Sequence, residues 1–144
     1  MATIRRLIFE KLEEILNTVT AAKEVSFGLP IEAVFPALGI VPLQEDTENE
    51  PDDIYIEVLK IAVRVVVDDN DEAAGYHLED ILADVHRAVL ADSKIGGLAD
   101  NIKKEGTRWG WLDPKYPFAG ADLLFEIRYQ TEEKDPSDSN FDQS

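Results

Sequence analysis

Residues 54–67 read IYIEVLKIAVRVVV and contain the strongest strand signal in the chain. Apolar side chains occupy every second position from Leu59 to Val67, while Lys60 and Arg64 fall on the opposite side. A period of two is typical of a strand with one buried face. At 14 residues the run exceeds the usual strand length, so we expect a partner strand on each side of it. The run therefore predicts the middle of a sheet.

Two helical patterns lie outside this strand. Residues 3–18 and 73–91 each carry apolar side chains at helical spacing, with charged residues elsewhere. Thr3 is a suitable N-cap for the first helix, and Asn70 or Asp71 for the second. The apolar stripes consist of Ile4, Leu7, Ile8, Leu12, Ile15 and Leu16 in the first helix and Leu78, Ile81, Leu82, Val85, Ala88 and Val89 in the second.

Three further strands are expected. Residues 35–43 are apolar but contain two prolines, which either places this strand at a sheet edge or confines its pairing to the middle of the strand. The acidic segment 45–53 (EDTENEPDD) then reads as a loop. Residues 100–111 and 121–131 are predicted strands, and the proline-containing segment 112–120 is predicted to join them as a loop.

The expected order is helix, strand, strand, helix, strand, strand. Helices with a single apolar stripe need a surface that buries the stripe, and an antiparallel sheet with alternating faces supplies one. We therefore predict a two-layer α+β sandwich, with a mainly antiparallel four-stranded sheet and both helices on one face. The length of 144 residues predicts one domain, over residues 1–131, followed by a flexible acidic tail at 132–144.

The composition excludes several classes of protein. The chain has 30 acidic and 14 basic residues, a net charge of −16, which opposes nucleic-acid binding. Most of the excess acid lies in 45–53, 68–72 and 132–144, where solvated loops are the simplest interpretation. The absence of cysteine excludes disulfides, thiolate nucleophiles and iron–sulfur clusters. No apolar run is long enough to predict a membrane span.

No motif predicts catalysis, a cofactor or a metal site. In the second helix His77, Asp80 and Asp84 lie on one side, but His86 is nine positions from His77 and points to the opposite side, so the two histidines do not converge. No serine lies in a G-x-S-x-G elbow, and no glycine-rich phosphate-binding motif occurs. We expect a protein that is not an enzyme and that needs no cofactor.

The sequence offers more residues typical of protein–protein interfaces than residues arranged for catalysis. Four aromatic residues fall within ten positions around the last hairpin, where they either pack in the core or anchor a protein–protein contact. The sheet face opposite the helices is too polar to form a second core, so it faces solvent or a neighbouring copy. The candidate interface residues are Lys60, Arg64, Glu126 and Arg128 on that face, and Trp109, Trp111, Tyr116 and Phe118 in the hairpin.

Residues 90–136 (LADSKIGGLADNIKKEGTRWGWLDPKYPFAGADLLFEIRYQTEEKDP) resemble the C-terminal half of the tail terminator, or tail completion, proteins of long-tailed bacteriophages. In that family a helix ends in a segment like ADSKIGGLA, and the closing strand is similar to AGADLLFEIRYQT. The N-terminal half is also similar, through IRRLIFEKLEEIL, FPALGIVPL and the strand at 54–67. The resemblance spans most of residues 4–136.

The resemblance implies an α+β subunit that assembles as a ring, usually a hexamer, on the head-proximal end of the phage tail tube. Binding to the last ring of the tail tube protein stops polymerisation, and the opposite face receives the neck or head-completion protein. The implied location is the virion tail, and the host cytoplasm during assembly. Such proteins are not enzymes and use no cofactor.

DNA passes through the lumen of such a ring, which suggests a use for the acidic residues. Carboxylates that face the lumen would repel DNA and keep it from adhering. The candidates for this role are Glu45, Asp46, Asp52, Asp53, Asp68, Asp69 and Asp71.

Three other functions are compatible with the sequence. The first is a neck or head-completion protein, which also works as a ring but at the head-tail connector. The second is an acidic DNA-mimic inhibitor, although its charge should form a continuous double row and here lies in three separate segments. The third is a small ligand-binding domain or metabolic enzyme, which binding of a small molecule in a thermal-shift screen would favour.

Overall fold

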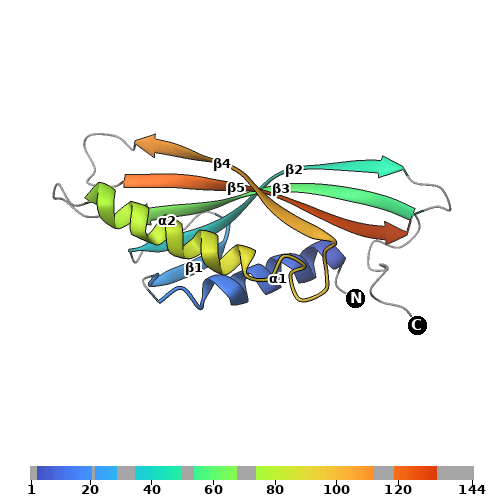
Figure 1. Cartoon of the computed structure of the whole chain (residues 1–144), viewed down its shortest axis with the longest axis horizontal. Coiled ribbons are helices and arrows are strands. Elements are labelled where there is room, and N and C mark those ends of the chain that lie inside the picture. The colour runs from blue at the N-terminus through green and yellow to red at the C-terminus, as the bar shows by residue number, and fades with distance from the viewer. Residues whose placement is uncertain are drawn as a thin grey trace.

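The computed structural model describes residues 3–20, 22–28, 35–49, 54–67, 74–111 and 119–132. Within these ranges the chain forms two helices and one five-stranded sheet (Figure 1). In chain order the elements are α1 (Ile4–Leu16), β1 (Glu24–Phe27), β2 (Ala37–Asn49), β3 (Ile54–Val67), α2 (Ala74–Leu90), β4 (Asn101–Trp111) and β5 (Ala119–Glu132). The α+β class predicted from the sequence is confirmed.

Strand β3 is the middle of the sheet, as its sequence predicts. The strand order is β1-β2-β3-β5-β4, and β3 pairs antiparallel with β2 on one side and β5 on the other. Its observed bounds, Ile54–Val67, coincide with the predicted run 54–67. Pairing with β5 continues over the full strand, from Ile54 opposite Glu132 to Val67 opposite Ala119.

Both helices lie on the same side of the sheet, in agreement with the prediction (Figure 1). The N-cap of α1 is Thr3, whose side-chain oxygen accepts a hydrogen bond from the Arg6 backbone N–H at 3.1 Å. Helix α1 contacts β1 and β2, while α2 contacts β3 and β5, and the two helices also contact each other. The predicted second helix, 73–91, is observed as Ala74–Leu90.

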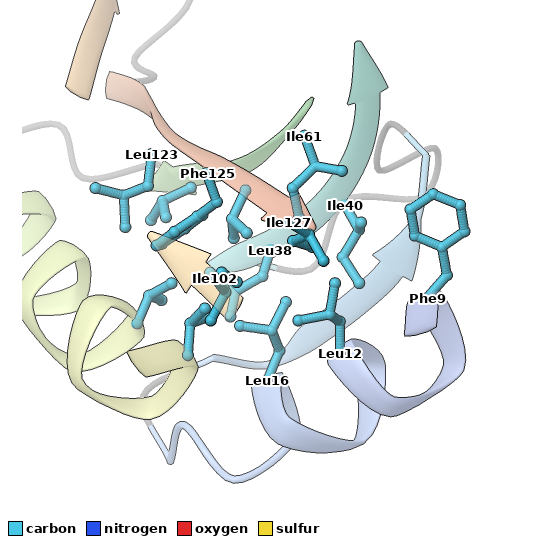
Figure 2. Close-up of a cluster of buried hydrophobic side chains, with 14 of the residues drawn as sticks. Phe9, Leu12, Leu16, Leu38, Ile40, Ile61, Ile102, Leu123, Phe125 and Ile127 are labelled. Atoms are coloured by element: carbon cyan, nitrogen blue, oxygen red, sulfur yellow. The ribbon is translucent and has the colours of Figure 1, made fainter. Parts of the chain in front are cut away.

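The core lies between the helices and the sheet. Side chains of α1, among them Leu12 and Leu16, point toward the sheet residues Leu38 and Ile40, as Figure 2 shows. Phe125 in β5 is fully buried. Most of the helix residues in this core belong to the apolar stripes that the sequence predicted from the helical spacing. The layered arrangement therefore follows from one apolar face per element.

The prediction of a four-stranded sheet was wrong. The sheet has a fifth strand, β1, which pairs parallel with residues 37–40 of β2, so the sheet is mixed. Consequently the first part of β2 is not an edge, although its two prolines suggested one. Pro36 precedes the strand, and Pro42 lies where the pairing between β2 and β3 shifts register, so neither proline interrupts the ladder.

The acidic segment 45–53 is not wholly a loop. Residues 45–49 continue β2 and pair with β3, from Glu45 opposite Leu59 to Asn49 opposite Tyr55. Several predicted features lie outside the described residues. They are the caps Asn70 and Asp71, the acidic candidates Asp52, Asp53, Asp68 and Asp69, the aromatic candidates Tyr116 and Phe118, and the tail beyond residue 132.

The link from α2 to β4 contains a turn built around Asp92. The Asp92 carboxylate accepts hydrogen bonds from the backbone N–H groups of Lys94 and Gly96. Gly96 and Gly97 have positive φ, a backbone conformation that glycine adopts without steric cost. Ile95 also has a positive φ, 51°, which is unfavourable for a β-branched residue, and its side chain is fully buried.

Candidate interaction surfaces

The sheet face turned away from the helices, here called the open face, carries the predicted polar residues. Phe125 and Ile127 of β5 are buried in the core, so the alternating residues Glu126 and Arg128 lie on the open face. Lys60 lies directly opposite Glu126, and Arg64 lies directly opposite Asp122. The four open-face residues predicted from the sequence therefore lie on one surface.

An ion pair between Arg64 and Asp122 anchors the open face. The Arg64 guanidinium donates two hydrogen bonds to the Asp122 carboxylate, at 2.8 Å from Nε and 3.0 Å from Nη2. The Asp122 side chain is only 10% exposed, whereas that of Arg64 is 38% exposed. The hydrogen bond to Asp122 raises the pKa of Arg64 above its ordinary value, so the guanidinium stays charged.

Further ion pairs on the open face join adjacent strands and also reach across β3, which separates β2 from β5. Lys103 of β4 lies 3.1 Å from Glu126 of β5, and Arg128 of β5 lies 2.8 Å from Glu48 of β2. Arg108 of β4 approaches the same Asp122 carboxylate at 3.8 Å. The open face is thus an ionic surface with both signs interspersed, although the chain as a whole is strongly acidic.

A cavity of about 370 Å³ opens on this face where β3, β4 and β5 run together. Two arginines and one carboxylate supply its charges. Its lining consists of Arg64, Val66, Arg108, Trp109, Gly110, Gly120, Ala121 and Asp122.

Trp109 is not a core residue. Its indole N–H donates to Glu79 of α2 at 3.2 Å, and the residue is 48% exposed. Tyr76, one turn before Glu79 on α2, is 79% exposed. Large aromatic side chains that combine an exposed face with a polar contact are common in protein–protein interfaces. The backbone of Trp111 lies two residues further along β4 than Trp109.

The two described acidic candidates lie on opposite faces of β2. Glu45 is opposite Leu59, on the helix side, where it accepts a hydrogen bond from Tyr129 at 2.6 Å and pairs with Arg5 at 2.8 Å. Asp46 is opposite Val58, on the open face. Of these two, only Asp46 is therefore on the same face as Lys60, Arg64, Glu126 and Arg128.

Glu45 belongs to a polar cluster near the N-terminus of α1 that the sequence did not reveal. This cluster surrounds a cavity of about 220 Å³. The residues that line it are Thr3, Arg5, Glu45, Thr47, Glu57, Tyr129 and Thr131. The one sequence signal was Glu57, an acidic residue on the apolar side of the central strand.

Two groups in this cluster have shifted pKa values. Burial raises the pKa of Glu57 above its ordinary value of 4.5; the hydrogen bond from Thr47 partly offsets this, and the Glu45 charge adds to it. Burial also raises the pKa of the Tyr129 hydroxyl, as does its hydrogen bond to Glu45, so it stays protonated and donates that bond. The cluster is internally hydrogen-bonded and positions α1 over the sheet.

The described residues contain neither a metal-binding cluster nor a membrane-spanning helix. In these ranges no group of three or more histidine and carboxylate side chains is placed to bind a metal ion. Within the same part of the chain, neither helix is long and apolar enough to cross a membrane.

Comparison with known proteins gives a likeness at the level of fold. No protein-family model matches this sequence, and no curated protein shows a significant sequence match. Among solved structures, the chain is similar to a chain in the virion of a native gene transfer agent particle. The TM-score is 0.51 at 11% identity, over 90% of this chain and 96% of the other. This fold occurs in a virion. At such low identity the likeness concerns the fold alone.

The Arg64–Asp122 pair should stabilise the fold more than an exposed pair does. We expect Asp122→Asn to lower the free energy of unfolding by about 1–2 kcal/mol, because the half-buried Arg64 loses its charged partner. The matched control is Asp84→Asn, which disrupts an exposed pair with Arg87 and should cost less than about 0.5 kcal/mol. Urea denaturation measures both, and equal losses would contradict the assignment.

The raised pKa of Glu57 predicts a pH-dependent stability. The folded chain holds the Glu57 proton more tightly than the unfolded chain, so stability falls as pH rises from 4.5 through the raised pKa. Glu57→Gln removes the charge and keeps an oxygen that can accept from Thr47. We expect the variant to melt at a higher temperature than the wild type at pH about 7, with the difference vanishing at pH about 4.

Circular dichroism at the two pH values measures this difference. The exposed carboxylate Glu10, changed to Gln, serves as the control and should show little pH-dependent difference. A Glu57→Gln variant that melts below the wild type at neutral pH would show that the buried carboxylate is not destabilising.

Proposed function

We propose that this chain is a structural subunit of a phage-type virion, forming a ring at the head-proximal end of the tail tube. In this role it ends polymerisation of the tube protein and provides the docking surface for the neck or head-completion protein. The observation that supports the proposal most is the fold shared with a chain of the gene transfer agent virion, which extends over nearly the whole of both chains. The sequence resemblance to tail terminator proteins supports the position in the tail.

The surfaces of the described chain suit a protein that acts by binding. The open face presents paired charges from β2, β3, β4 and β5, and Trp109 and Tyr76 add exposed aromatic area elsewhere on the chain. Interfaces commonly combine aromatic anchors with a polar surround. We propose accordingly that the protein works without a catalytic step or a cofactor, and that its partners are other copies of itself, the tube protein and a neck protein.

The test is an early stop codon in the gene for this chain, followed by negative-stain electron microscopy of the lysate. We expect overlong tail tubes without heads, because polymerisation would lack its stop signal. The matched control is a synonymous change at the same codon, and a plasmid copy of the wild-type gene should restore normal tails. Both controls separate loss of the protein from an effect on neighbouring genes.

Other outcomes would contradict the terminator role. Tails of normal length beside full heads without tails would place the protein in the neck instead. Intact infectious particles would show that it has no structural role in the head-to-tail joint.

A further inference from the structure

The sheet has two edges with different composition. At one edge, β4 pairs with β5 and has no other strand partner among the described residues. At the other edge, β1 covers only residues 37–40 of β2. Residues 41–49 of β2 therefore pair with β3 on one side, and in the described part of the chain no strand covers their other side. Both edges carry exposed side chains along most of their length.

These two edges carry opposite charges. Residues 41–49 contain Glu45, Asp46 and Glu48 and no basic residue, whereas β4 contains Lys103, Lys104 and Arg108 against the single acidic residue Glu105. A basic strand is unusual here, because the chain has only 14 basic residues against 30 acidic ones. The two edges are therefore electrostatically complementary.

We propose that β4 of one copy of this chain pairs with residues 41–49 of β2 in the next copy, joining the sheets edge to edge. This inference rests on the ring in the proposed function and identifies the surface through which neighbouring subunits bind. The partner at each edge is a second copy of the same chain.

The strand directions fit such a contact. Each of the pairs β2–β3, β3–β5 and β5–β4 is antiparallel, so β2 and β4 run in opposite directions within one sheet. A neighbouring copy in the same orientation therefore presents its β2 antiparallel to β4. Repeating this one relation around an axis gives a head-to-tail ring, in which every subunit uses both edges.

The charges also specify a register. If Lys103 lies opposite Asp46, antiparallel pairing places Lys104 opposite Glu45. Lys103 and Asp46 are both on the open face, since they lie opposite Glu126 and Val58. Lys104 and Glu45 are both on the helix side, opposite Phe125 and Leu59. A slip of one residue would place each lysine on the wrong face.

This register implies a stagger between neighbouring copies. Within one sheet Lys103 is level with Gln44, through the successive pairs with Glu126 and Lys60. Opposing Asp46 instead offsets the neighbour by two residues, about 7 Å along the strand. An offset in one direction at every contact is what a sheet needs in order to close on itself.

The same charges disfavour the alternative pairings. Two β4 edges would bring lysines together, and two β2 edges would bring carboxylates together, so a two-fold dimer through either edge is repelled. Lys104 already lies near like charge: burial is the largest cause that lowers the pKa of His86, and the charges of Lys104 and Arg87 lower it further. In the proposed register Lys104 would approach Glu45 of the next copy, which also pairs with Arg5 and accepts from Tyr129 in its own chain.

Engineered disulfides test the proposal, because the native chain has no cysteine. The matched pair is Asp46→Cys with Lys103→Cys in one chain. The control pair is Asp46→Cys with Arg108→Cys, since the side chains of Lys103 and Arg108 are 60% and 63% exposed and both lie on the open face of β4. The register shift between Lys104 and Gly106 puts positions 103 and 108 on the same face, and their partners Glu126 and Asp122 are four residues apart, about 14 Å along the strand.

Within one chain the two introduced cysteines cannot meet. Strands β2 and β4 are separated by β3 and β5, which is about 14 Å, and a disulfide needs Cα atoms within about 7 Å. Mild oxidation of the matched variant should therefore give a ladder of covalent oligomers above the dimer. We expect its yield to exceed that of the control by about tenfold at equal concentration.

Absence of a ladder, or equal ladders from the matched and control variants, would overturn edge pairing. Peptide mass spectrometry of the ladder should find position 46 of one copy linked to position 103 of another, and links between identical positions alone would also overturn the proposal. The outcome is independent of the stop-codon experiment. Overlong tails in the stop-codon mutant, without covalent oligomers of the matched variant, would support the terminator role and reject this interface. Covalent oligomers of the matched variant, with tails of normal length in the stop-codon mutant, would support this interface and reject the terminator role.

Discussion

The structure depends on strand β3 being paired on both sides. Because β2 and β5 flank it, its apolar side chains at Ile61, Val63 and Val65 are fully buried. The helices then have one continuous surface to pack on, and their apolar stripes bury there together. Double pairing of the middle strand also dictates that the free edges belong to other strands, β4 on one side and β1 with the distal part of β2 on the other.

The sequence predicts those elements in which one face is buried along the whole length. This condition produces the period of two in β3 and β5 and the helical period in α1 and α2, and all four were located within about two residues. It also placed Lys60, Arg64, Glu126 and Arg128 on one face without reference to any contact. A half-buried element therefore shows its burial in its own sequence.

Elements whose environment is set by distant parts of the chain were not predictable in this way. Strand β1 has four residues, too few to show a period, and its pairing with β2 depends on the packing of α1. Residues 45–49 read as an acidic loop because their side chains are largely polar. They form a strand because β3 supplies the hydrogen-bonding partner there.

The partners of the open-face charges were missed for a related reason. Asp122 meets Arg64, and Glu48 meets Arg128, only once the register across three strands is known. The buried cluster around Glu57 likewise combines residues from α1, β2, β3 and β5. A pattern within one strand carries no information about such pairings.

The proposed ring would have to form against the net charge of −16 on each copy. The edges would provide local attraction, because the basic strand β4 and the acidic residues 41–49 of β2 attract each other although whole subunits repel. Electron cryo-microscopy of the joint between tail tube and head in intact particles tests this account most directly. The account predicts a ring of this chain in which β4 of each copy continues the sheet of the next through β2. Neighbours that meet through their helices, or a joint without this chain, would contradict it.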